Sequence, residues 1–200
     1  MPRAEGIEDL LSFFQRREPV DEWVHGAPHP DDLDLRRRAA AGIAAFDDHE
    51  AQWESRYLAF GLALIDADRA ALDEAVADLQ RLTSAVRQRD HQQSLRQVAS
   101  VHAFIRGELD EAGRLAEEVL ATSLETFSLS WAASIHYALI GPVREAQGRA
   151  GELWPQIAAL AEHSPEFVTW HVVAASVAYA TGDAASLDRE LALVADTGLA

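Results

Sequence analysis

Apolar residues recur along this chain at three- and four-residue intervals, the spacing that places them on one face of an α-helix. The first two apolar stripes contain Trp53, Tyr57, Phe60 and Leu64, and then Leu72, Val76, Leu79, Leu82 and Val86. Later stripes are formed by Leu109, Ala112, Leu115 and Val119; by Phe127, Trp131, Ile135 and Leu139; by Leu153, Ile157, Leu160 and Ala161; by Phe167, Trp170, Ala174 and Val177; and by Leu187, Leu191 and Val194. No segment alternates as a half-buried strand does, so the pattern predicts an all-α fold.

The junctions between these helices share one composition: a glycine or small residue, an acidic residue, and then an alanine-rich helix. The copies read RGELDEA at 106–112, TGDAASL at 181–187, QGRAGEL at 147–153 and DADRAAL at 66–72. Glycine suits the left-handed residue that ends a helix, and an acid suits the start of the next one. Aligned on Ala67, Gly107, Gly148 and Gly182, the copies lie 40, 41 and 34 residues apart.

A spacing of 34 residues is the tetratricopeptide period, and about 40 fits the same helix pair with longer connections. We therefore predict a short right-handed tetratricopeptide-like solenoid of about four antiparallel helix pairs over residues 31–200. An N-terminal helix, around Glu8 to Arg16, and a loop are expected within residues 1–30. Because the ends of such a stack are exposed, we expect self-association through a terminal helix pair, or docking to further domains.

The segment RGELDEAGRLAEEVL at 106–120 resembles the second-helix signature of tetratricopeptide repeats. The wider layout is similar to the repeat regions that follow the ATP-binding domain in large actinobacterial regulators, namely LuxR-type and antibiotic-regulator-type transcription factors and adenylyl-cyclase-like proteins. The comparable segments are 23–26, 36–48, 145–149, 153–155 and 165–170. The resemblance covers about residues 20–200 and leaves residues 1–19 without a counterpart. Since such proteins usually continue further, we expect an excised segment or a shortened relative.

This resemblance implies a non-enzymatic interaction and sensory module of a cytoplasmic transcription regulator or signalling ATPase. Its concave face would bind a peptide, a protein or a small effector, without a cofactor. The chain contains no His-Glu-x-x-His motif and no nucleophile elbow, and it has no lysine for a Walker loop. An alternative is a small stand-alone helical enzyme or accessory protein of a biosynthetic pathway, with histidines and tryptophans lining a pocket.

The composition and net charge of the chain limit the classes of molecule that it is expected to bind. Of the 200 residues, 48% are hydrophobic and 25% are charged, which is typical of a globular domain. The 17 basic residues, all arginine, face 33 acidic ones, and a net charge of −16 disfavours direct contact with nucleic acid. The longest apolar run, at 172–180, is about half of the ~20 residues that a membrane span needs, and no signal-peptide segment is present. We expect a cytoplasmic protein; the absence of cysteine excludes disulfides and thiolate chemistry.

Two sets of residues are candidates for ligand binding. Gln93, Arg96, Gln97 and Ser100 are expected on the groove side of one helix. His136 and His171, which lie 35 residues apart on the first helices of two pairs, would be neighbours in adjacent repeats and could contact an acidic peptide. Otherwise these two histidines, and His102 in a different register, are partly buried and hydrogen-bonded. The stretch containing Arg81, Arg87, Arg89, Arg96 and Arg106 is either an anion site or a set of solvated and helix-ending arginines.

Two His/Asp clusters, three tryptophans and one proline are explained by the fold and not by ligand binding. The clusters at 25–34 and 47–50 combine imidazole and carboxylate groups that could ligate a metal ion, but helix capping by Asp31 or Asp32 and by the acids at 47–50 is favoured, and no metal site is predicted. Trp53, Trp131 and Trp170 fall on apolar stripes and are expected in the core rather than in a ligand pocket. Pro142 should kink or split its helix.

Overall fold

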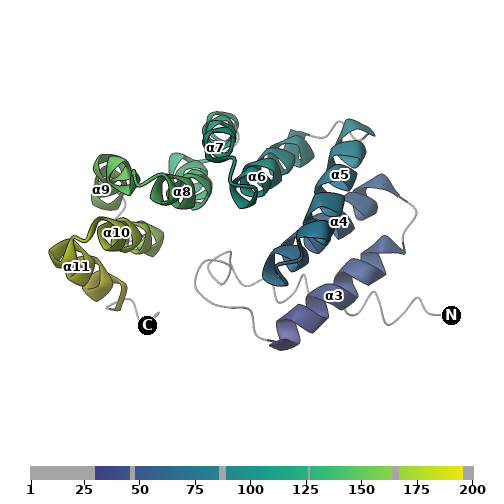
Figure 1. Ribbon diagram of the computed structural model, residues 1–200, viewed down its shortest axis with the longest axis horizontal. Helices are drawn as coiled ribbons and strands as arrows, with labels where there is room; N and C mark the ends of the chain where they lie inside the picture. Colours follow the sequence, from purple (N-terminus) through teal and green to yellow (C-terminus); the bar gives the residue numbers. More distant parts are fainter. Residues whose placement is uncertain (1–29, 46–47, 86–88, 126, 164–166, 196–200) are drawn as a thin grey trace. The chain divides into compact units, whose positions relative to one another are not determined.

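The computed structural model describes residues 30–45, 48–85, 89–125, 127–163 and 167–195, and within these ranges every regular element is a helix (Figure 1). The all-α prediction is therefore confirmed. The chain divides into two compact units, Met1–Leu95 and Arg96–Ala200. None of the described helices combines the length and the apolar character required to cross a bilayer. The predicted helix at Glu8 to Arg16 lies outside the described residues.

The first unit contains α3 (Pro30–Ala44), α4 (His49–Ile65) and α5 (Arg69–Ala85), and α6 (Arg89–Ile105) begins in it. Helix α3 packs on α4, and α4 packs on α5. Trp53 is 2% exposed, donates from Nε1 to Oγ1 of Thr83 at 2.8 Å, and stacks on the ring of His91 with 4.1 Å between the ring centroids. The predicted stripe of α5 is buried at Leu72, Val76, Leu79 and Leu82.

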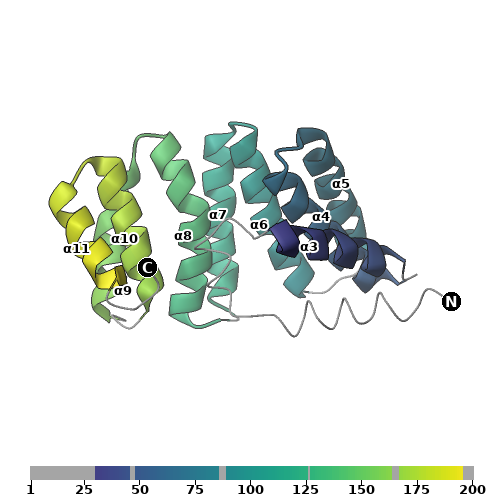
Figure 2. The same ribbon diagram turned by 90° about the horizontal axis from the view of Figure 1, so that it is seen from below.

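The second unit contains the end of α6, then α7 (Leu109–Ser123), α8 (Leu129–Ala146), the 3₁₀ turn η1 (Ala150–Leu153), α9 (Trp154–His163), α10 (Val168–Thr181) and α11 (Ala184–Ala195). Consecutive helices pack together: α7 on α8, α9 on α10, and α10 on α11 (Figure 2). Small side chains allow this close packing, and the core of the unit is formed by Ala103, Ala112, Ala116, Ala133, Tyr137, Ile140, Val143, Leu153, Ile157, Trp170, Ala174 and Val177.

The four aligned junctions adopt one backbone conformation. Among the described residues, positive φ angles occur at Ala67 (52°), Gly107 (79°), Gly148 (70°) and Gly182 (74°), the four positions aligned in the sequence. After each of them the next N–H donates back to a carbonyl of the outgoing helix; for Gly107 this bond runs from Glu108 to Ala103 at 2.9 Å. The left-handed residue itself donates a second bond, from Gly107 to Phe104 at 2.9 Å, and the two bonds together form a Schellman motif. The prediction of a repeated left-handed helix end is confirmed.

Acidic side chains cap the first turn of several helices. Asp48 accepts a hydrogen bond from the N–H of Ala51 at 2.9 Å, and Asp68 accepts one from the N–H of Ala71 at 3.1 Å. The capping interpretation of segment 47–50 is thus confirmed for Asp48. Helix α3 already begins at Pro30, so Asp31 and Asp32 lie in its first turn instead of before it.

Asp183 caps α11 in the same way, with Oδ1 accepting from the N–H of Ser186 at 3.1 Å. Hydrogen bonds from the side chain and backbone of Ser186 hold the pKa of Asp183 below its ordinary value. A carboxyl group with a lowered folded-state pKa stabilises the fold above its unfolded-state pKa, and that stabilisation is lost as the pH falls through the folded-state value. We therefore expect Asp183→Ala to destabilise the chain at neutral pH and to cost progressively less below about pH 4. Urea unfolding of the unsubstituted chain and of Asp183→Ala, measured from neutral pH to below about pH 4, tests this prediction. A difference in stability between the two that does not change with pH would contradict it.

Three local expectations are corrected by the structure. Helix α8 continues through Pro142, so the predicted split does not occur. Pro142 and Ala138, the residue whose carbonyl the proline cannot bond, are both exposed, so that this carbonyl can bond to water. Arg89 begins α6 and does not close the helix that starts at Arg69. In α11 the fully buried positions are Ser186 and Glu190, whereas in the predicted apolar stripe Leu191 is 51% exposed and Leu187 and Val194 are only half-buried.

Candidate functional site

The residues predicted on the groove side of α6 do not form an exposed set. Ser100 is 1% exposed and donates from its hydroxyl to the carbonyl of Ala112 at 2.9 Å, so it joins α6 to α7. Gln93 is 6% exposed, and Arg96 and Gln97 are half-buried. Gln93 and Ser100 are therefore buried and not part of an exposed surface.

The two candidate histidines are buried and have different partners. Nδ1 of His136 lies 3.1 Å from the carbonyl oxygen of Ala116. Nδ1 of His171 lies 2.8 Å from Oε2 of Glu190, itself a buried residue. Both histidines are therefore buried and hydrogen-bonded, and His102 is half-buried.

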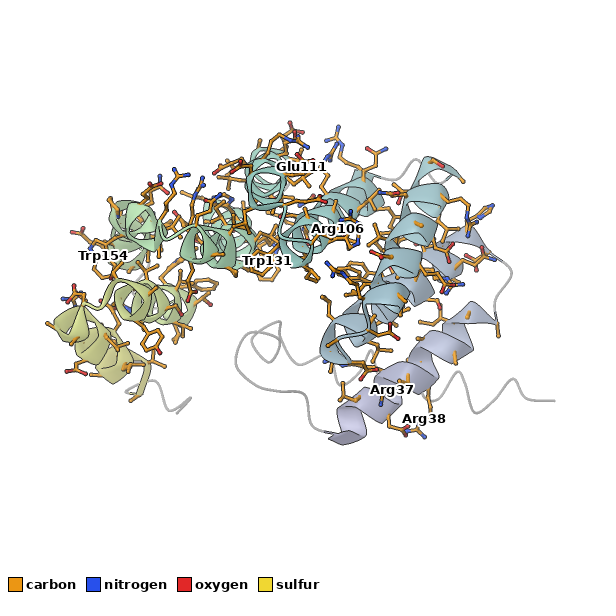
Figure 3. All side chains as sticks on the ribbon, viewed as in Figure 1. Arg37, Arg38, Arg106, Glu111, Trp131 and Trp154 are labelled. Atoms are coloured by element: carbon orange, nitrogen blue, oxygen red, sulfur yellow. The ribbon has the colours of Figure 1, made fainter. Side chains whose placement is uncertain are left out.

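The remaining candidates are accounted for by packing and pairing. Trp53 and Trp170 are in the core as predicted, whereas Trp131 on α8 and Trp154 at the start of α9 are half-buried (Figure 3). Arg81 and Arg106 are largely exposed and pair with Asp78 and Glu108, as solvated arginines do. Arg87, His25 and His29 lie outside the described residues. Within the part of the chain that the structure describes, no three His, Asp or Glu side chains are grouped to hold a metal ion.

The second unit contains a hollow of about 490 Å³ between α7, α8 and the η1–α9 segment. Figure 1 and Figure 2 both show α8 between α7 and α9. Helix α8, which carries the candidate His136, therefore forms one wall of the hollow, and α7 and the η1–α9 segment form the others. Its lining residues are Glu117, Leu120, Leu124, Leu129, Ala133, His136, Tyr137, Arg144, Glu152, Leu153, Gln156, Ala159 and Leu160.

One end of the hollow is apolar. Leu124 closes α7 and Leu129 opens α8, and they are 47% and 56% exposed. Leu120 and Leu160 continue this apolar wall from α7 and α9. Exposed leucines at the mouth of a concavity are an apolar surface that a ligand can cover.

The other end of the hollow is polar and centred on Glu117. Oε2 of Glu117 lies 3.9 Å from Nε2 of His136, and Oε1 lies 4.0 Å from Nη2 of Arg144. Both separations exceed hydrogen-bond length, so this half-exposed carboxylate keeps its capacity to accept. Arg144 instead donates to Oε1 of Gln147 at 2.8 Å.

Two further groups complete the polar end. Tyr137 donates from its hydroxyl to Oε1 of Gln156 at 3.0 Å. Burial, together with the negative charge of Glu117, raises the pKa of Tyr137, so the phenol stays a neutral donor. Glu152 is ionised, because hydrogen bonds from Arg149 lower its pKa, with a further contribution from the charge of Arg144. The polar end thus combines two carboxylates with one guanidinium.

Comparison of the chain with protein-family models, with curated proteins and with solved structures finds no match. Function is therefore inferred from the hollow and its residues. Sequence reasoning singled out only His136 of the lining residues. The signal available in the sequence was the occurrence of His136 and Tyr137 on an otherwise apolar helix face, beside two helices that carry Glu117 and Gln156.

Proposed function

We propose that this chain is a non-enzymatic sensory module of a cytoplasmic regulatory protein, built as a tetratricopeptide-like stack of helix pairs. The hollow between α7 and α9 is its effector site. The observation that carries the proposal is this hollow, whose volume of about 490 Å³ falls within the range of small-molecule sites, roughly 300–1,000 Å³.

The repeated junctions support the stacked architecture. The same left-handed residue and returning hydrogen bond end α4, α6, α8 and α10, and each is followed by the second helix of a pair or by the turn that leads to it. Stacked helix pairs transmit a change of angle from one pair to the next, since each pair contacts only its neighbours. An effector that bridges α7 and α9 stabilises one relative placement of two consecutive pairs, and it shifts the population toward the state that it binds better.

The lining supports binding rather than catalysis. His136 is next to a backbone carbonyl and a carboxylate, and none of the described residues that line the hollow is a serine, threonine or cysteine that the imidazole could activate. The polar side chains and leucines instead provide orientation and apolar contact, the combination that characterises ligand pockets.

A neutral, environment-sensitive dye tests whether the hollow accepts an apolar molecule. We expect Nile red to bind the full chain saturably with a rise in fluorescence, and Ala159→Trp to abolish most of that signal by filling the hollow from α9. Ala138→Trp is the matched control, because Ala138 is also an exposed helical alanine but does not line the hollow. Equal Nile red binding by both variants would show that the hollow is not the site and would remove the basis of the proposed function.

A further inference from the structure

The tautomer of His136 determines whether its Nε2 atom donates or accepts a hydrogen bond. A carbonyl oxygen only accepts, so the contact of Nδ1 with the carbonyl of Ala116 requires a proton on Nδ1. In the neutral imidazole Nε2 is then an acceptor. This acceptor lies 3.9 Å from another acceptor, Oε2 of Glu117, at the polar end of the hollow.

The separation of these two acceptors allows one N–H donor group to bond both of them. A nitrogen about 2.9 Å from each of them makes two ordinary hydrogen bonds, because the atoms of Glu117 and His136 are 3.9 Å apart. A primary ammonium has three donors and carries the charge that a carboxylate favours. The carboxylate of Glu117 is 55% exposed and the His136 side chain 6% exposed, so the pair is reached from the hollow through the glutamate side.

The charges at this end of the hollow disfavour an anionic head group. Glu117 stands within 4.0 Å of both potential anion binders, His136 and Arg144, so an anion that approached either of them would meet the carboxylate. The unit as a whole is acidic, with six arginines against fourteen acidic residues over 96–200. A cation is therefore attracted over the surface and at the site.

We propose that the hollow binds amphiphilic organic amines, with the ammonium between Glu117 and His136 and the apolar body along Leu120, Leu124 and Leu129. This assignment rests on the proposed function and names the chemical class of its effector. The apolar body gains about 25 cal/mol for each Å² that these leucines remove from water, and the ammonium supplies the selectivity.

Isothermal titration calorimetry of the full chain with octylamine, octyltrimethylammonium and octanoate tests the assignment. Octylamine is charged at neutral pH and donates three N–H groups; octyltrimethylammonium has the same charge without a donor, and octanoate has the opposite charge. We expect octylamine to bind more tightly than octyltrimethylammonium, and octanoate not to bind. Ala159→Trp should abolish octylamine binding.

Glu117→Gln isolates the role of the carboxylate, and Glu118→Gln is its matched control. Both residues are exposed on α7, but Glu118 pairs with Arg114 and does not line the hollow. We expect Glu117→Gln to weaken octylamine binding by about tenfold, because the amide oxygen still accepts from the ammonium but the negative charge that strengthens this bond is gone, and Glu118→Gln to leave it unchanged.

The outcomes separate this assignment from the proposed function. If octanoate or octyltrimethylammonium binds as tightly as octylamine, and Ala159→Trp abolishes that binding, the hollow is an effector site but the amine assignment is wrong. An equal effect of the Glu117 and Glu118 substitutions also overturns the assignment, because octylamine then responds only to net charge. If Ala159→Trp changes the binding of none of these probes and does not change that of Nile red, both proposals fail.

Discussion

Replacement of Trp170 by alanine is expected to lower the free energy of unfolding by about 3–5 kcal/mol, the largest effect of any single substitution considered for this chain. The Trp170 side chain is 0% exposed at the centre of the core of the second unit. Its ring contacts Tyr137 edge-on, with 5.9 Å between centroids, and Phe167 at 5.8 Å. No neighbouring side chain can fill such a cavity without leaving its own packing, so most of the lost contact energy is not recovered.

Urea unfolding followed by circular dichroism measures this loss, and hydrogen exchange shows where protection falls. Trp170→Phe should cost much less than Trp170→Ala, because it keeps an aromatic ring and because Nε1 of Trp170 has no hydrogen-bond partner among the described residues. Trp154→Ala is the matched control on the half-buried tryptophan of α9. Similar costs for Trp170→Ala and Trp154→Ala would contradict the placement of Trp170 in the core.

The helices of this chain could be predicted from the sequence because the information is local. A helical stripe such as Leu72 to Leu82 needs only the 3.6-residue period, and the ends of helices need only a residue that tolerates positive φ. That tolerance is why the alignment on Gly107, Gly148 and Gly182 coincides with the left-handed positions of the structure. Ala67 adopts φ 52° without being glycine, and only its place in the repeated pattern revealed it.

The hollow could not be predicted in the same way, because it depends on which helix faces meet. Glu117, Tyr137 and Gln156 come from three elements, and their proximity requires the pairing of α7 with α8 and of α8 with the segment leading into α9. A polar residue is also wrongly predicted to be exposed when its side chain forms a hydrogen bond with a buried backbone group. Ser100 reads as a surface residue, yet its hydroxyl bonds the carbonyl of Ala112 inside the core.

The second large effect is expected at the pair formed by His171 and Glu190. Glu190→Ala should cost about 2–3 kcal/mol, because it removes a charged hydrogen bond and leaves Nδ1 of His171 buried without its acceptor. Glu190 also accepts two bonds from Arg189, at 3.0 and 2.9 Å, which would be lost together. Thermal and urea unfolding of Glu190→Ala and Glu190→Gln measure this cost, and the amide should retain part of the stability because its oxygen still accepts from the imidazole.

A double-mutant cycle with His171→Ala separates the pair from simple truncation of two side chains. The sum of the two single costs should exceed the cost of the double variant by about 0.5–3 kcal/mol, the range for directly contacting partners. Asp188→Ala, an exposed acidic residue of the same helix, is expected to change stability by no more than about 0.5 kcal/mol. Additive costs would mean that α11 is positioned by other contacts. A positive coupling would instead mean that the hydrogen-bonded pair determines the rotation of α11 about its axis. This rotation buries Glu190 against α10 and leaves Leu191 half exposed, whereas packing of the leucines alone would favour a different rotation.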